Sequence, residues 1–244
     1  MNPPDDPRFA GVTVPDPAFA DDDGGPAPAV AALLAEHAAG RASTRDVAAA
    51  LRGARLMTPL VAVLDEAETT PDGLRAEKSS HMASVSVLTP DGRRGLLAFT
   101  SVASMAAWDP AARGIPAHAA RAAAAALEEG ADALVIDLGG PVRVALEGAL
   151  LLAVATERPL PPAHEDPDVR AAAAQVLGTV PGLSAARLVP RVDGDGTDLR
   201  VLVAAAPHAA LADVARRAAQ GLVADPVIAG LCPGGVDVAE LVTP

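Results

Sequence analysis

The chain has to fold around a core that is almost free of aromatic side chains. It contains no tyrosine and only four aromatic residues, Phe9, Phe19, Phe99 and Trp108, although half of its 244 residues are hydrophobic. Alanine and aliphatic side chains must therefore fill the interior, where any large buried ring dominates the packing around it. We expect Phe99 and Trp108 to anchor the core of one domain.

The scarcity of particular residue types excludes several kinds of chemistry. Lys78 is the only lysine among 19 basic residues, and it follows Leu-Arg-Ala-Glu rather than a glycine-rich loop, so a P-loop phosphate site is excluded. Its polar surroundings also disfavour a Schiff base with pyridoxal phosphate. The net charge of -12 repels a phosphate backbone, and few rings are available to stack on bases. We therefore expect no nucleic-acid partner and no cofactor.

Cysteine usage and hydropathy point to the cytoplasm. Cys232 is the only cysteine and cannot form an internal disulfide, which fits a reducing compartment. The N-terminus lacks the basic start and the apolar run of a secretory signal. The longest stretch without a charged side chain, residues 171–186, has 16 residues, and residues 95–108 have 14, whereas a membrane-spanning helix needs about 17 to 25. We expect a cytoplasmic protein without a membrane partner.

Residues 1–29 form an acidic, proline-rich segment. Six acids against Arg8 give this segment a charge of 1 minus 6, or -5, and it has few large aliphatic residues. Such a composition buries too little apolar surface to offset the entropy lost on ordering. We predict a disordered tail. Phe9 and Phe19 are candidates for a short docking motif, but contact of the tail with its own domain is the favoured interpretation.

Residues 30–157 predict a domain of mixed helices and strands. Ser43 and Asp46 have the spacing of a capping box, and the turn Thr89-Pro90-Asp91-Gly92 predicts a β-hairpin. The helices are predicted at 30–39, 45–55, 101–108, 119–129 and 147–156, and the strands at 56–64, 83–88, 95–99, 131–138 and 142–145. This order is α+β, because it lacks a repeating βα register.

The segment 158–168 predicts a linker, since it holds four prolines and three acids. Residues 169–244 predict a second small α+β domain. Its helices are predicted at 169–177, 209–222 and 227–231, and its strands at 185–192, 198–205 and 234–241.

Three short motifs have a structural and a functional interpretation. Residues 193–198, Asp-Gly-Asp-Gly-Thr-Asp, lack the flanking helices and the distal glutamate of a calcium-binding EF-hand, so a hairpin turn is favoured. The five histidines lack metal-ligand spacing, and we interpret the cluster at 164–168 as solvated charge. Cys232 precedes Pro233-Gly234-Gly235, but its apolar neighbours favour a buried, inert thiol over a nucleophile. We expect no metal site.

Several segments together resemble a known family. They are the run DGRRGLLAFTS at 91–101, Trp108-Asp109-Pro110, the alanine-rich stretch 122–126, the strand ADALVID at 131–137, and Gly140-Pro141. This pattern resembles the N-terminal domain of the SseB family, bacterial proteins named for enhanced serine sensitivity, and covers roughly residues 30–157. The last 80 residues resemble the C-terminal domain of some members. The resemblance implies no agreed reaction and transfers no catalytic residue.

We therefore expect a two-domain, non-enzymatic interaction or regulatory module with an unidentified protein partner. Its binding candidates are Phe99, Trp108, Asp109 and Arg93. One alternative is a small-molecule-binding domain or an enzyme linked to serine or sulfur metabolism, with Cys232 or His81 recruited to the site. In a third interpretation, residues 1–29 are the functional element. The sequence leaves the oligomeric state open.

Overall fold

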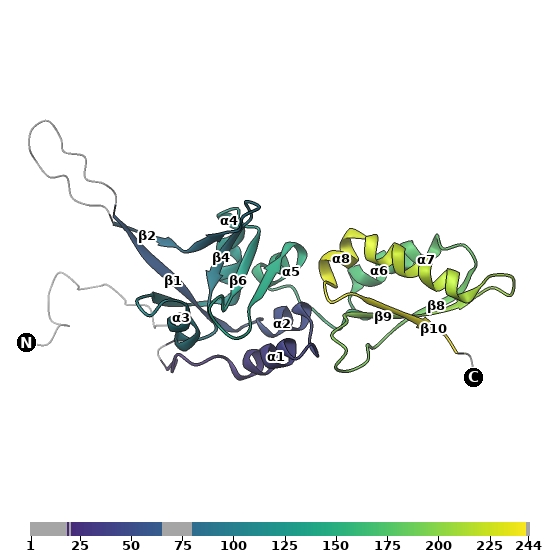
Figure 1. Ribbon diagram of the computed structural model, residues 1–244, viewed down its shortest axis with the longest axis horizontal. Coiled ribbons are helices and arrows are strands. Elements are labelled where there is room, and N and C mark those ends of the chain that lie inside the picture. The colour runs from purple at the N-terminus through teal and green to yellow at the C-terminus, as the bar shows by residue number, and fades with distance from the viewer. Residues whose placement is uncertain (1–18, 20, 65–79, 243–244) are drawn as a thin grey trace, which may run out of the picture.

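The computed structural model describes residue 19, residues 21–64 and residues 80–242, which form eight helices and ten strands (Figure 1). The helices are α1 (Pro28–Ala38), α2 (Thr44–Ala50), α3 (Val102–Trp108), α4 (Ala119–Glu128), α5 (Gly148–Ala155), α6 (Pro167–Gly178), α7 (Leu211–Ala224) and α8 (Pro226–Leu231). The strands are β1 (Arg55–Leu64), β2 (Ser80–Ser84), β3 (Ser86–Leu88), β4 (Arg94–Ala98), β5 (Arg113–His118), β6 (Ala133–Ile136), β7 (Val144–Glu147), β8 (Leu183–Val189), β9 (Leu199–Ala205) and β10 (Val236–Glu240). The mixture confirms the α+β class. None of the described helices is long and apolar enough to cross a membrane.

Two small sheets organise the N-terminal part of the chain, residues 19–157. One has the order β3-β4-β6-β7, with β4 and β6 parallel and the outer pairs antiparallel. The other has the order β2-β1-β5. A bridge between Met57 of β1 and Phe99, just after β4, joins the two sheets through backbone hydrogen bonds of 2.7 and 2.8 Å. The two sheets of the N-terminal part are therefore joined to each other.

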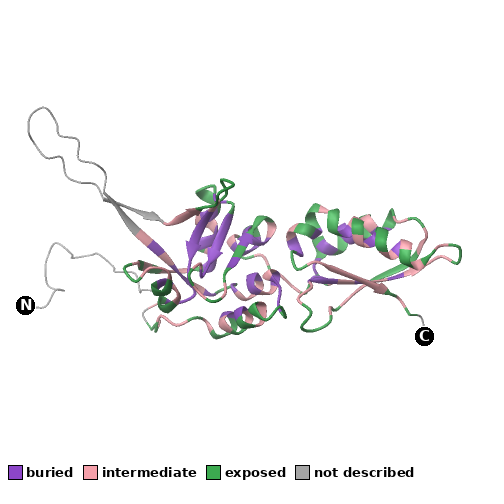
Figure 2. Cartoon of the chain, viewed as in Figure 1, coloured by how far each residue is buried: buried purple, intermediate pink, exposed green. Residues whose placement is uncertain are grey.

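The sheet β3-β4-β6-β7 is buried on both faces in its centre (Figure 2). Helices α4 and α5 cover the face that carries Leu96 and Leu134. The opposite face carries a smaller cluster around Phe99, which is fully buried, and the ring of Trp108 packs against it at a centroid distance of 5.4 Å. This confirms that Phe99 and Trp108 anchor one core.

Local sequence signals set the ends of several elements. Ser43 and Asp46 form the predicted capping box at the start of α2. Ser101 and Ser104 form another at the start of α3, which was not predicted. The hairpin of β3 and β4 turns at 89–92, where Gly92 has a φ of 86°, a left-handed conformation that favours glycine.

The C-terminal part, residues 167–242, is a three-stranded sheet with helices on one face (Figure 1). The strand order is β10-β9-β8, in which β9 is parallel to β10 and antiparallel to β8. Leu199, Val201 and Val203 of β9 are buried under the helices. The segment 193–198 connects β8 to β9, which confirms the hairpin interpretation.

The strand β5 was not predicted, because residues 113–118 were interpreted as a connection to the following helix. Pro116 cannot donate a backbone hydrogen bond, which argues against a central strand. The structure pairs β5 with β1 alone, at the edge of its sheet, with Pro116 opposite Met57. An edge strand accommodates a proline because one side of the strand is not paired.

The described end of the predicted tail lies against its own domain. The Arg55 guanidinium forms an ion pair with Asp22 at 2.5 Å and donates to the carbonyl of Gly25 at 2.6 Å. The ring of Phe19 lies 5.0 Å from that of His118. Contact of the tail with its own domain, the favoured interpretation, is thus present at Phe19, Asp22 and Gly25. The predicted disorder of residues 1–18 lies outside the described residues.

Candidate functional site

The four candidate binding residues do not form one site. Phe99, Trp108 and Asp109 lie together, since Trp108 ends α3 beside Phe99. The Asp109 carboxylate accepts a hydrogen bond from the amide of Ala111 at 2.8 Å and so stabilises the turn after the helix. Arg93 precedes β4, whereas Phe99 follows it, so Arg93 lies at the opposite end of that strand. The candidates share a sheet face rather than a pocket.

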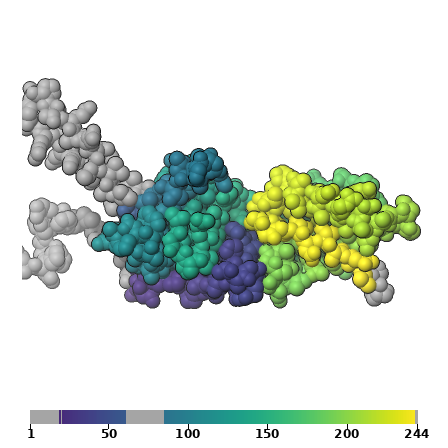
Figure 3. Space-filling view, in the orientation of Figure 1, coloured from purple at the N-terminus to yellow at the C-terminus, as the bar shows by residue number. Residues whose placement is uncertain are grey.

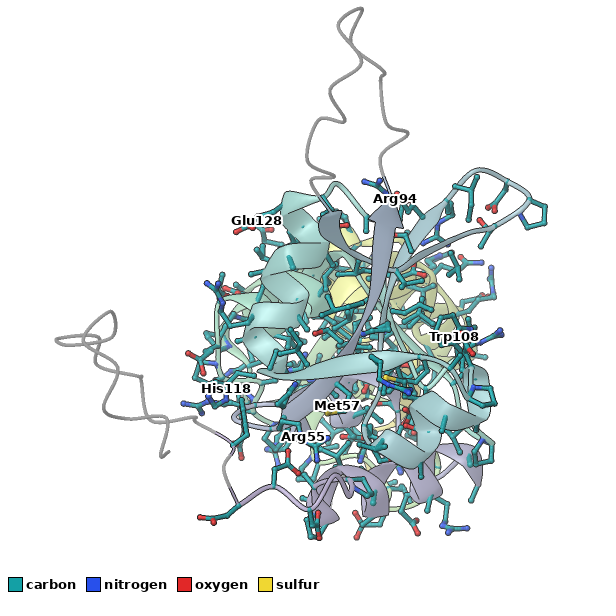
Figure 4. The ribbon with its side chains drawn as sticks, turned by 90° about the vertical axis from the view of Figure 1, so that its left-hand side faces the viewer. Arg55, Met57, Arg94, Trp108, His118 and Glu128 are labelled. Atoms are coloured by element: carbon teal, nitrogen blue, oxygen red, sulfur yellow. The ribbon has the colours of Figure 1, made fainter. Side chains whose placement is uncertain are left out.

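An open groove of about 240 Å³ lies on the same sheet face, towards the Arg93 end. We call it the sheet-face groove. Its floor is small and apolar and comprises Val87, Gly95, Ala133, Val135, Leu138 and Ala145. Its rim is charged and comprises Arg93, Arg94, Asp132, Arg143 and Glu147, with Thr89 beside them. Figure 4 shows Arg94 at the end of the sheet that lies away from Arg55 and Met57.

Gly95 lets the Val135 side chain pack directly on the backbone of β4 at the floor of the groove. A Cβ on Gly95 would lie 2.6 Å from a methyl carbon of Val135, so Val135 fills the space that a side chain would need. At the other end of the face, a Cβ on Gly139 would lie 2.6 Å from the Cα of Trp108, so α3 closes that end. Helices α4 and α5 pack on the opposite face, and the end at Gly95 remains open.

The rim of the sheet-face groove is more cationic than the chain as a whole. Arg93 forms an ion pair with Glu147 at 2.7 Å, and Asp132 accepts a hydrogen bond from the backbone amide of Arg94 at 2.7 Å. The guanidinium groups of Arg94 and Arg143 form no ion pair with any residue that the structure describes. Three arginines against two carboxylates give the rim a charge of +1 in a chain of -12.

The N-terminal and C-terminal parts of the chain meet at a junction (Figure 3). A cluster of buried charges lies at this junction. Arg45 of α2 donates to the Asp166 carboxylate and to the carbonyls of Pro161 and Leu231, each at 2.8 Å. Asp166 also accepts a hydrogen bond from Arg158 at 2.9 Å and caps α6 through the amide of Asp168. Burial would raise the pKa of Asp166, but the hydrogen bond and charge of Arg45 outweigh it and lower the pKa.

Interpreting residues 164–168 as solvated charge was therefore wrong for Asp166, which has no exposed surface. The predicted linker is held in place by this carboxylate. One cluster of buried apolar side chains also runs across the junction, from Leu51 and Leu150 to Leu222 and Leu231.

A second buried carboxylate crosses the same junction. Asp198, the last residue of the Asp-Gly-Asp-Gly-Thr-Asp segment, accepts hydrogen bonds from the Ser43 hydroxyl and, at 2.7 Å, from the amide of Gly234. Nearby, Arg191 forms an ion pair with Asp46 at 2.7 Å. Burial raises the pKa of Asp198, more than its hydrogen bonds lower it.

The junction contains a cavity of about 360 Å³, and four of the charged groups that line it already have partners. Arg45, Asp46, Arg191 and Asp198 all line it, and each is hydrogen bonded or ion paired within the chain. Cys232 lies nearby and is buried, and burial raises the pKa of its thiol to about 12. A thiolate is therefore negligible at neutral pH, in agreement with the buried, inert interpretation.

Within the described parts of the chain, no group of three or more His, Cys, Asp or Glu residues is arranged to hold a metal ion. Arg94, Arg143 and Gly95 of the sheet-face groove were not named from the sequence. Gly95 carried a usable signal, because a glycine inside a strand often marks a close approach of another group. Arg143 carried none, since its position depends on the pairing of β7 with β6.

The raised pKa of Asp198 predicts a pH-dependent effect of Asp198→Asn. A carboxyl whose folded-state pKa is raised destabilises the fold as pH rises from the unfolded-state pKa through the folded-state value. Asparagine accepts from Gly234 and donates to Ser43 without this cost. The free energy of unfolding of Asp198→Asn, relative to the unchanged chain, should rise between acidic and neutral pH in urea titrations.

Asp195 in the same turn provides a control of opposite sign. Its pKa is lowered, chiefly by the hydrogen bond from the Thr197 hydroxyl, so its ionised form stabilises the fold. Asp195→Asn should lose relative stability as pH rises through the range in which the unfolded carboxyl ionises. Equal pH dependence in the two variants would contradict the role given to burial at Asp198.

Comparison with known families gives one match. The family model described as the SseB protein N-terminal domain matches residues 30–153, which is 124 of 244 residues. This span contains the sheet-face groove and all four candidate residues. No curated protein and no solved structure matches the chain. The resemblance of the last 80 residues to a C-terminal domain lies outside the matched span and stays a prediction.

Proposed function

The chain belongs to the SseB family, and on that premise we propose that it is a non-catalytic interaction module that binds a partner protein in the sheet-face groove. The observation that carries the proposal is a net cationic rim over a small apolar floor, in which Arg94 and Arg143 form no ion pair with any described residue. The buried charges at the junction, by contrast, already have partners: Arg45 pairs with Asp166, and Asp198 accepts hydrogen bonds from Ser43 and Gly234.

The size of the groove favours a protein segment over a small-molecule ligand. Ligand pockets usually enclose about 300 to 1,000 Å³, whereas the sheet-face groove measures about 240 Å³ and is open to solvent. Such a volume accommodates one or two apolar side chains of a larger partner. Arginine is enriched at the centres of protein interfaces, and Arg94 and Arg143 flank the floor. The partner segment should therefore present an apolar residue beside carboxylates.

The alternative of a small-molecule site or enzyme has less support in the same geometry. Asp109 and Cys232 do not line the sheet-face groove, and Cys232 is buried at the junction. The side chain of His81 lies outside the described residues. Serine and sulfur metabolites are therefore included as competing ligands in the binding test described below.

Reversing the charge of the rim should abolish partner binding. In the full chain carrying Arg94→Glu and Arg143→Glu, a photo-cross-linking residue at the exposed Ala145 should capture protein at least about tenfold less than in the unchanged chain. Both substitutions are at surface positions, so the free energy of unfolding should change by no more than about 1 kcal/mol. Cross-linked products are quantified by mass spectrometry.

Arg121→Glu supplies the matched control, because Arg121 is exposed on α4, on the other side of the sheet. It should leave capture at Ala145 unchanged. Undiminished capture by the double variant would overturn the proposal. Stabilisation by an amino acid or a sulfur metabolite, about 2.7 kcal/mol at a hundredfold excess over Kd, without protein capture would support the alternative.

A further inference from the structure

The outer edge of β8 is an unpaired strand edge with exposed side chains. Strand β8 pairs with β9 on one side, and no described strand pairs with its other side. Residues 184–187, Ser-Ala-Ala-Arg, are exposed on both faces of the strand. The opposite edge strand, β10, is half-buried and packs against α7. An uncovered edge offers backbone N–H and C=O groups to another extended chain.

A groove of about 740 Å³ runs between this edge and α6. We call it the edge groove. Its apolar lining comes from Ala174 and Leu177 of α6, Val180 and Leu183 before and at the start of β8, and Leu188 near its end. A groove between a helix and a strand edge is a recurring site for an extended peptide, which adds a strand to the sheet and places alternate side chains in the groove.

The charges around the edge groove indicate which kind of segment fits. Residues 165–244 contain six arginines, and three of them are ion paired, to Asp46, Asp237 and Asp213. Arg170 on α6 and Arg187 on β8 line the edge groove and form no ion pair with any residue in the described ranges. Glu165 also lines the edge groove, so two arginines against one glutamate give its lining a charge of +1 in a chain of -12. Arg170 and Arg187 can therefore each bind a carboxylate of a partner.

We propose that the edge groove binds an extended, carboxylate-bearing segment of a partner protein, which adds a strand to the outer edge of β8. This site is separate from the sheet-face groove, and main-chain pairing contributes to recognition. A second copy of the chain is the less favourable occupant. Pairing β8 with β8 would bring the arginines of two edge grooves together, and like charges in an interface oppose association.

The test uses the full chain and synthetic peptides of about eight residues, a length within the usual range of strands. The probe peptide alternates valine and threonine and carries two glutamates. One matched peptide replaces the glutamates with glutamine, and another carries N-methyl groups on alternate backbone amides. Fluorescence anisotropy gives the Kd, and amide chemical shifts of the ¹⁵N-labelled chain locate the binding. The glutamate peptide should bind and shift the amides of residues 184–187.

Changes to the peptide and to the chain then separate the contributions of the carboxylates, the main-chain pairing and the two arginines. The glutamine and N-methyl peptides should each bind the unchanged chain at least about tenfold more weakly than the probe peptide does. The probe peptide should likewise bind the chain with Arg170→Glu and Arg187→Glu at least about tenfold more weakly than it binds the unchanged chain. Arg217→Glu is the matched control, because Arg217 is exposed on α7 and forms no ion pair within the described residues. It should leave the Kd unchanged.

The proposal is overturned if the probe does not bind at about 1 mM, if the glutamine peptide binds equally well, or if the double variant binds the probe normally. Self-association of the chain without peptide, abolished by Arg170→Glu and Arg187→Glu, would assign the edge groove to a second copy and also overturn it. These outcomes are independent of the sheet-face groove, because the variants of Arg94 and Arg143 are not used.

Discussion

Replacing Asp166 by alanine should lower the free energy of unfolding by about 3 to 5 kcal/mol, because it leaves the Arg45 guanidinium buried without its counter-charge. Arg45 and Asp166 are both buried, and their ion pair measures 2.8 Å. The substitution also removes the N-cap of α6. Urea unfolding at neutral pH measures the loss, which is a large part of the stability of a typical domain.

The exposed ion pair of Arg41 and Glu36 is the matched control, since about half of each side chain is open to solvent. Glu36→Ala should lower the free energy of unfolding far less than Asp166→Ala does, because solvent screens an exposed ion pair. A loss at Asp166→Ala as small as that at Glu36→Ala would contradict the buried charge pair. A paired replacement, Arg45→Met with Asp166→Leu, should cost less than Asp166→Ala alone, because no charge is then left unpaired.

The same pair predicts how the loss depends on pH. Because the pKa of Asp166 is lowered in the folded state, its contribution to stability is present above the ordinary value of 3.8 and disappears as pH falls through the folded-state pKa. The difference between Asp166→Ala and the unchanged chain should therefore shrink in acid. Asp198→Asn should show the opposite pH dependence, because the pKa of Asp198 is raised rather than lowered in the folded state. Both carboxylates nevertheless lie at the same junction.

Interactions between near neighbours could be predicted from the sequence. The capping box of Ser43 and Asp46 joins residues three apart, and the turn at 89–92 needs a glycine with positive φ at a position where the sequence has one. Such signals depend on the local backbone alone. The helices and strands that they delimit were therefore found, with ends displaced by a few residues.

The junction could not be predicted, because its interactions join residues far apart in the chain. Arg45 and Asp166 are separated by 121 positions, and Ser43 and Asp198 by 155. An aspartate before a proline-led helix has the same local signature whether it is buried or solvated. The tertiary fold decides which of the two it is, and Asp166 was misread as solvated for this reason.

The candidate site was predicted in part. Arg93 lines the sheet-face groove, and Phe99 and Trp108 lie on the same sheet face, but they pack in the core rather than in the groove. Strand alternation places Gly95 and Phe99 on the same side of β4, with Leu96 on the other. The pairing of β4 with β6 and β7 then adds Val135 and Arg143, and this pairing has no signal in a single strand.

Phe99→Ala should lower the free energy of unfolding by about 3 to 5 kcal/mol, because it opens a cavity in a core that has few other large side chains. The ring is fully buried and packs against Trp108. The backbone of residue 99 keeps both hydrogen bonds to Met57, at 2.7 and 2.8 Å, so the loss reports on the ring. Because Trp108 is the only tryptophan, its fluorescence should also change when the adjacent ring is removed.

Val102→Ala on α3 is the control, since its side chain is 46% exposed and its truncation should change stability by no more than about 0.5 kcal/mol. The loss of stability for Phe99→Leu should lie between the losses for Val102→Ala and Phe99→Ala, because leucine fills part of the space left by the ring. A loss below about 1 kcal/mol for Phe99→Ala would contradict its role as an anchor. The chain would then depend on alanine and aliphatic side chains even where the rings of Phe99 and Trp108 meet.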